Sequence, residues 1–120
     1  MTILEAINKD PMLVGRHPQS EVIRWLSELD GMVKSNIINT HEGGDGEELK
    51  PYTEDDMLKT LLIPFPYDGA YEYWLSAKDY ATTDTKRYAN AMNMFNSVYT
   101  AFERSYNRKH MPIGKKLKFS

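Results

Sequence analysis

The apolar residues of the chain recur mainly at steps of three and four positions, which is the spacing of one face of an α-helix. The clearest run extends from Pro18 or Ser20 to about Thr40, and its stripe consists of Val22, Leu26, Leu29, Val33 and Ile37. Gly31 lies inside this run, where it costs roughly 1 kcal/mol relative to alanine. The spacing therefore predicts one long helix, with either a close helix crossing or a break at Gly31.

Two more helices are predicted in the second half of the chain. Residues 67–81 place Ala70, Tyr71, Trp74, Ala77 and Ala81 on one side. Residues 86–108 carry a main row and a second row beside it: Tyr88, Met92, Phe95, Tyr99, Phe102 and Tyr106, then Ala91, Met94, Val98 and Ala101. A stripe this wide indicates burial on more than one side, in a bundle or against a neighbouring subunit.

The first ten residues predict a short helix. Thr2 and Glu5 have the spacing of a capping box, in which each residue binds the backbone of the other at a helix start. The apolar face is Ile3, Leu4 and Ile7. Pro11 ends the helix, because the residue before a proline is excluded from the α region. We expect a loop through Gly15 and Pro18.

Residues 41–56 have a different composition, with seven acids and three glycines. A stretch of this kind predicts a long flexible acidic loop. The chain then closes with a basic C-terminal tail at residues 109–120. The expected fold is mainly α, a small helical bundle of three main helices plus a short N-terminal helix. It has at most a minor β-element near Leu61–Ile63 or Leu117–Phe119.

The composition limits the classes of protein to consider. A chain of 120 residues suits one domain over residues 1–120, and its 41% apolar content can supply a core. The net charge of −2 gives no overall attraction to nucleic acid. The absence of cysteine excludes disulfides, thiolate nucleophiles and cysteine zinc sites. Without a signal peptide or a membrane-length apolar run, we expect a cytoplasmic protein.

The sequence offers no catalytic signature. His17, His41 and His110 share no metal-ligand spacing. The glycines of residues 43–46 lie among acids, which would repel a phosphate. We therefore expect no enzyme, no metal and no cofactor. A small metal-dependent protein stays open as an alternative, with a cleft lined by His41, Asp45, Glu47 and Glu48.

The charges are divided between the acidic loop and the C-terminal end. The candidate subunit interface consists of Glu47, Glu48, Asp55, Asp56, Arg108, Lys109, Lys115, Lys116 and Lys118. An acidic patch on one copy that meets a basic tail on the next is a heterologous contact, which generates a ring when the rotation closes. Binding of the basic tail to DNA phosphates is an equally open alternative. Trp25, Tyr73 and Tyr80 fall outside the main stripes and are the candidate exposed aromatics.

Several segments resemble a family of head–tail connector proteins from prophages of Gram-positive bacteria. The likeness rests on residues 61–68 (LLIPFPYD), on Tyr71, Trp74 and Leu75, and on the ending from Tyr106 to Pro112. Residues 23–31 (IRWLSELDG) and 40–44 (THEGG) extend it, so it covers about residues 22–119. The family has no catalytic residues to transfer to this chain.

The resemblance implies a structural virion protein with a helical connector fold. About a dozen copies would form a homo-oligomeric ring beneath the portal protein, seal the DNA-filled head and bind a tail-side connector protein. The implied location is the host cytoplasm during assembly and then the head–tail junction of the virion. We also expect non-specific contact with packaged DNA, and we expect no contact with a membrane.

Two further classes stay open as alternatives. In a helix–turn–helix regulator, residues 20–40 would form two short helices separated at Gly31. The second helix would present Lys34, Ser35, Asn36 and Asn39. The unbroken apolar stripe and the lack of basic residues around it favour one continuous helix instead. An adaptor unrelated to phage would use the same aromatic surface, and the position of the gene distinguishes it from a connector.

Overall fold

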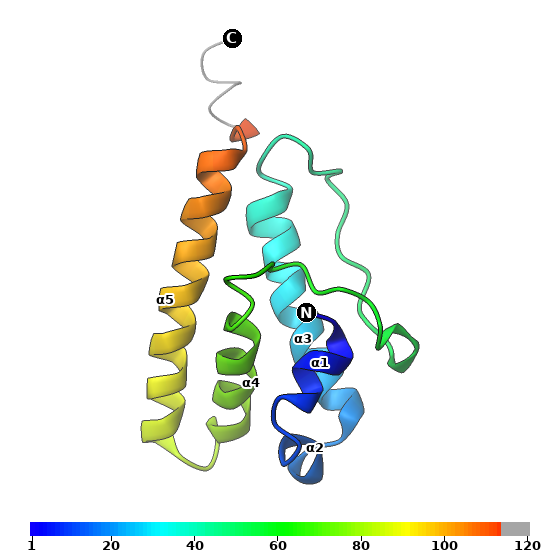
Figure 1. The fold of residues 1–120 in the computed structure, drawn as a ribbon, viewed down its shortest axis with the longest axis vertical. Helices are drawn as coiled ribbons and strands as arrows, with labels where there is room; N and C mark the ends of the chain where they lie inside the picture. Colours follow the sequence, from blue (N-terminus) through cyan, green and yellow to red (C-terminus); the bar gives the residue numbers. More distant parts are fainter. Residues whose placement is uncertain (114–120) are drawn as a thin grey trace.

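The computed structural model describes residues 1–113 as a small helical bundle (Figure 1). The elements are α1 (Ile3–Asn8), α2 (Leu13–Arg16), α3 (Gln19–Val33), the π-helical turn η1 (Lys34–Ile38), the 3-10 turn η2 (Glu54–Asp56), α4 (Ala70–Tyr80) and α5 (Thr85–Lys109). The mainly α fold with three main helices and a short N-terminal helix is confirmed. Residues 1–113 contain isolated bridges at Thr2–Thr60 and His41–Pro112 but no strand.

The predicted apolar stripe lies on the buried face of α3 and continues into η1. Its five stripe residues have exposed fractions of 0–1% and belong to the core: Val22, Leu26, Leu29, Val33 and Ile37. The helix runs through Gly31 without a break and continues into η1. A Cβ atom on Gly31 would have no heavy atom of the surrounding structure within 4 Å. Gly31 therefore marks neither a close crossing nor a break.

Helices α4 and α5 form a hairpin, with α4 between α5 and α3 (Figure 1). The Asp84 carboxylate accepts a hydrogen bond of 3.1 Å from the Arg87 backbone N–H, which caps the start of α5. The indole of Trp74 donates to the Trp25 carbonyl oxygen at 2.8 Å and so links α4 to α3. The core between these helices therefore combines aromatic packing with a buried hydrogen bond.

The main row of α5 faces this core, with Phe95 and Phe102 both 4% exposed. The Phe95 ring lies 5.1 Å from the Trp74 ring, measured between centroids. In the second row Ala91 is buried, whereas Met94 and Ala101 are exposed. Within one copy, therefore, α5 is buried along one main side.

Trp25 corrects one prediction, because it is 6% exposed and not a surface aromatic. Its ring packs edge-on against His17 with centroids 4.9 Å apart. Trp25 lies beside the α3 stripe, and the packing of α4 and the N-terminal segment on α3 extends burial beyond that stripe. Tyr73 and Tyr80 are half-buried.

The N-terminal segment forms the predicted capping box between Thr2 and Glu5. Helix α2, a single turn, was expected as loop because four residues are too few to show a periodicity. Residues 61–63 do not form a strand; the Leu61 N–H donates to the Met1 carbonyl oxygen at 2.9 Å. The other predicted β-element, Leu117–Phe119, lies outside the described residues.

Candidate interaction surface

An apolar pocket of about 290 Å³ lies between the loop that precedes α4 and the C-terminal part of α5. We call it the Phe65 groove. Its lining residues are Ile38, Leu62, Pro64, Phe65, Pro66, Tyr67, Phe102, Ser105, Tyr106, Lys109 and His110. The volume is at the lower end of small-molecule sites, roughly 300–1,000 Å³. The lining is mainly apolar and aromatic, which suits contact with another apolar surface.

The floor of the groove continues the aromatic row of α5. The Phe102 ring lies 6.0 Å from both the Tyr67 ring and the Tyr106 ring. Tyr106 stacks on His110, with ring centroids 3.8 Å apart and an interplanar angle of 12°. The sequence pattern placed Phe102 and Tyr106 on one helix face but gave no sign that their row ends in an open groove.

Phe65 stands at the edge of this groove and is 85% exposed. Large apolar side chains this exposed are a mark of interaction sites when they adjoin a wider apolar surface. The peptide bond between Phe65 and Pro66 is cis. Tyr67 N–H closes the same turn by donating to the Pro64 carbonyl oxygen at 2.8 Å.

The loop that carries Phe65 is attached to the core through Asp30, a fully buried carboxylate on α3. Asp30 accepts hydrogen bonds from the Tyr52 hydroxyl (2.6 Å), the Tyr71 hydroxyl (2.5 Å) and the Leu62 N–H (3.0 Å). The Tyr71 hydroxyl also accepts from the Ile63 N–H at 2.7 Å. The loop therefore presents Phe65 from a fixed backbone, which reduces the ordering cost of a contact.

Burial dominates the electrostatics of this network. Desolvation raises the pKa of Asp30, and the three donated hydrogen bonds oppose that rise. Burial, together with the neighbouring Asp30 carboxylate, raises the pKa values of Tyr52 and Tyr71 as well, so both hydroxyls stay protonated as donors. Asp30 has no cationic partner among its hydrogen-bonding groups. Its role in this structure is to join α3, α4 and two loops.

The acidic loop is also attached to the helical body. Lys34 on η1 pairs with Asp45 and donates to the Glu47 carbonyl oxygen at 3.0 Å. The Lys34 ammonium group lowers the pKa of Asp45. Gly44 lies so close to η1 that a Cβ atom there would be 2.5 Å from the Ile38 carbonyl oxygen. Gly44 therefore allows close approach of the loop, and Gly43 and Gly46 adopt positive φ angles of 95° and 77°.

His41 lies at the start of the acidic loop, and its side chain is buried. Its Nδ1 lies 2.6 Å from the Ile37 carbonyl oxygen, and its Nε2 lies 2.7 Å from Oδ1 of Asn107. Beside it, the Ile113 N–H donates to the Thr40 carbonyl oxygen at 2.9 Å. The acidic loop and the C-terminal segment thus begin side by side in the same copy.

The predicted interface residues fall into three groups. Glu47, Glu48, Asp55, Arg108 and Lys109 are exposed. Asp56 is half-buried and accepts a hydrogen bond of 2.8 Å from the Thr53 N–H, which lowers the pKa of its carboxyl group. The three lysines of the tail, Lys115, Lys116 and Lys118, lie outside the described residues. Of the members of this set within residues 1–113, Lys109 is the one that lines the Phe65 groove.

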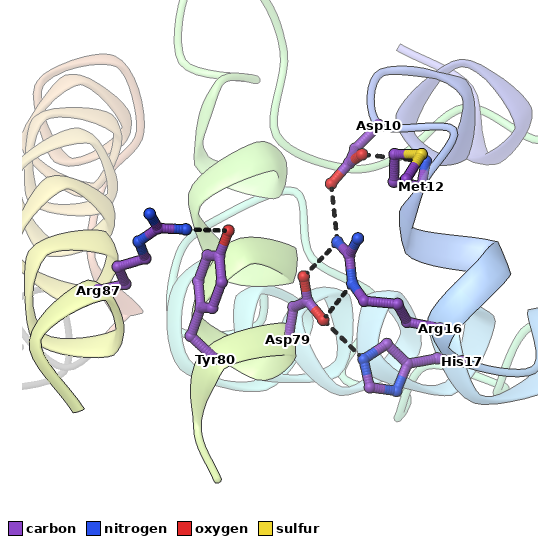
Figure 2. Close-up of polar contacts among 7 residues, drawn as sticks. All are labelled: Asp10, Met12, Arg16, His17, Asp79, Tyr80 and Arg87. Atoms are coloured by element: carbon purple, nitrogen blue, oxygen red, sulfur yellow. Dashed lines mark hydrogen bonds and ion pairs between the residues drawn. The ribbon is translucent and has the colours of Figure 1, made fainter. Parts of the chain in front are cut away.

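A second polar cluster surrounds Asp79 near the end of α4 (Figure 2). The Arg16 guanidinium donates to its two carboxylate oxygens at 3.1 and 2.5 Å. His17 Nε2 lies 2.8 Å from Oδ1 of Asp79. The Arg16 hydrogen bonds, followed by the His17 contact, lower the pKa of Asp79. The cluster joins the segment around α2 to α4 and was missed from sequence, although an Asp near the apolar positions of a helix is a recognisable signal.

Among residues 1–113, no group of three or more His, Asp or Glu side chains is arranged to hold a metal ion. His41, Asp45, Glu47 and Glu48 do not line a common cleft in any described pocket. In the same part of the chain, every helix is too short or too polar to cross a membrane.

Comparisons of the chain with protein-family models, with curated proteins and with solved structures gave no match.

Proposed function

We propose that the chain is a structural subunit of a phage head–tail connector. The observation that carries this proposal is Phe65, which is 85% exposed on a fixed loop beside an apolar groove. Such a surface suits protein–protein contact, where exposed aromatic anchors supply much of the binding free energy. In this role, copies of the chain form a ring beneath the portal protein in the host cytoplasm and stay at the head–tail junction of the virion.

The position of the groove in the sequence supports the same proposal. Residues 61–68, one of the segments on which the resemblance to connector proteins rests, include the loop at one side of the groove. The ending from Tyr106 to Pro112 forms part of its other side and then pairs with His41. Two of the five resembling segments therefore meet at the Phe65 groove, whereas Tyr71, Trp74 and Leu75 of a third are buried in the core.

The alternative of a helix–turn–helix regulator has no comparable support. Its two helices would need a turn at Gly31, whereas α3 continues through that residue into η1. The proposed recognition residue Lys34 is engaged by Asp45 and the Glu47 carbonyl oxygen. A connector subunit therefore accounts for more of the observed surface than a DNA-binding regulator does.

The test is binding to the portal protein whose gene lies in the same head-assembly cluster. Purified chain and assembled portal are mixed, and bound chain is measured by co-sedimentation. We expect the wild-type chain to bind and Phe65→Asp to lose binding without a change in its circular dichroism or melting temperature. Met12→Asp, at another exposed apolar position (68%) in the turn before α2, is the matched control and should bind as wild type does. The proposal fails if the gene has no capsid or tail neighbours or if wild-type chain does not bind the portal.

A further inference from the structure

Leu58 is a second large apolar side chain at the surface, with an exposed fraction of 79%. Both of its chain neighbours are attached to α1. The Leu4 N–H donates to the Met57 carbonyl oxygen at 2.9 Å, and the Ile3 N–H donates to the Lys59 carbonyl oxygen at 3.1 Å. Leu58 therefore projects from a held turn and not from a free loop.

Two acids lie three and four positions before Leu58 in the chain. Glu54 and Asp55 belong to η2, and both side chains are exposed. Neither carboxylate forms an ion pair with any other residue of the described range 1–113. We call this unit of Glu54, Asp55 and Leu58 the Leu58 knob. It combines an apolar tip with unpaired negative charge.

The Phe65 groove has the opposite charge at its edge. Lys109 and His110 are its titratable residues besides two tyrosines, and Arg108 adjoins them in the last turn of α5. No acidic residue is found among its described lining residues. Arg108 and Lys109 also lack an ion-pair partner within residues 1–113. Knob and groove are therefore complementary in both hydrophobicity and charge, which favours their association.

The segment that carries the Leu58 knob and helix α5, which forms one wall of the groove, lie on opposite sides of the molecule (Figure 1). The segment of residues 54–60 forms the right edge of the view, whereas α5 forms the left edge. One copy therefore cannot place its own knob in its own groove.

We propose that the Leu58 knob of one copy occupies the Phe65 groove of the next copy. This head-to-tail contact deepens the proposed function, on which it rests, by naming the residues that join neighbouring subunits. Leu58 enters the apolar groove beside Phe65, and Glu54 and Asp55 approach the basic end of α5. Repetition of a heterologous contact gives a ring if the rotation closes and a filament if it does not.

The first test is disulfide trapping, which is clean because the chain has no cysteine of its own. Leu58→Cys on one copy is mixed with Pro64→Cys on another, both at exposed positions. A disulfide needs Cα atoms within roughly 7 Å, so it reports direct seating of the knob. We expect mixed dimers to form several-fold faster than with Asn96→Cys, a control on α5 outside the groove. Equal rates for the two pairs would overturn the proposal.

The second test uses complementation between two charge variants, with mass measured by sedimentation. Leu58→Asp places a charge at the apolar tip of the knob and leaves the groove unchanged. Phe65→Asp places a charge at the edge of the groove and leaves the knob unchanged. We expect neither variant to self-associate alone and a one-to-one mixture to stop at dimers, because one intact contact remains. Either variant self-associating as strongly as the wild type would refute this contact.

These tests separate this proposal from the proposed function. Specific trapping without portal binding would leave the subunit contact in place and remove the connector role. Portal binding without specific trapping would keep the connector role and show that the subunits meet through another surface.

Discussion

Asp30 illustrates how a single buried group fixes the interaction surface. The carboxylate is surrounded by three donors and holds the loops before and after residue 57 against α3. Burial raises its pKa, so the folded state takes up a proton more readily than the unfolded chain. The stability that the Asp30 carboxyl group contributes therefore falls as the pH rises from 3.8, its ordinary pKa, through its raised pKa in the folded protein.

The two tyrosines of this network should differ in their importance. Tyr52→Phe removes one hydrogen bond to the carboxylate, and we expect a loss of about 1–2 kcal/mol in the free energy of unfolding. Tyr71→Phe also leaves the Ile63 N–H without its acceptor, so its loss should be larger, about 2–4 kcal/mol. Urea unfolding of both variants measures the difference. Equal losses would contradict the double role of the Tyr71 hydroxyl.

Asp79 has the opposite dependence on pH, because Arg16 and His17 lower its pKa. The stability that the Asp79 carboxylate contributes is complete above pH 3.8, its ordinary pKa. It is lost as the pH falls through the lowered pKa of the folded protein. We expect Asp79→Asn to cost about 1–2 kcal/mol near neutral pH. That cost should shrink toward zero below about pH 4, close to the unfolded-state pKa of Asp.

Melting temperatures of wild type and Asp79→Asn between pH 3 and pH 7 provide the measurement. Asp10→Asn is the matched control, since Asp10 is half-exposed and lies 3.5 Å from the same guanidinium. Exposed ion pairs contribute little to stability, so this variant should melt close to the wild type. A cost of Asp79→Asn that does not change with pH would show that the ion pair is not its cause.

Helix α3 contains a glycine, Gly31, whose effect on the stability of the protein can be tested directly. Gly31 has helical geometry and open space where a Cβ atom would be. We expect Gly31→Ala to stabilise the protein by about 0.5–1 kcal/mol, because alanine loses less backbone entropy in a helix. Gly44→Ala is the contrasting variant and should destabilise, since its Cβ would meet the Ile38 carbonyl oxygen at 2.5 Å. A destabilising Gly31→Ala would mean that α3 is interrupted.

Helix α5 separates a buried side from an exposed side. Phe95→Ala and Phe102→Ala remove side chains that are 4% exposed, and each should cost about 3–5 kcal/mol in thermal or urea unfolding. Met94→Ala removes a half-exposed side chain on the same helix and is the control, with a loss of well under 1 kcal/mol. Small losses for both phenylalanines would place the buried face elsewhere.

The periodicity of the sequence predicted the long helices because their burial repeats at a fixed spacing. The capping box of Thr2 and Glu5 was predictable for the same local reason. Trp25 was not, because its burial depends on two other segments that pack against α3. The Asp30 and Asp79 clusters are equally non-local: Asp30 reaches Tyr71 across 41 positions, and Asp79 reaches Arg16 across 63.

For the molecule as a whole, the sequence predicted an acidic loop and a basic C-terminal segment but not the apolar groove. The groove forms where residues 64–67 meet the end of α5, which no spacing along the chain reveals. The structure also shows that the acidic loop and the C-terminal segment start beside each other in one copy. Among the charges of residues 1–113 that form no ion pair are those of the Leu58 knob and of the end of α5, which the proposed subunit contact brings together.

The most direct test of the assembly role is the mass of the protein in solution over a concentration series, with and without the portal protein. Sedimentation and negative-stain images are compared for wild type and Phe65→Asp. We predict that the wild type forms closed rings, alone or on the portal, and that Phe65→Asp stays a folded monomer under the same conditions. A compact dimer that is unaffected by Phe65→Asp and binds duplex DNA tightly would contradict the connector role and favour a regulator.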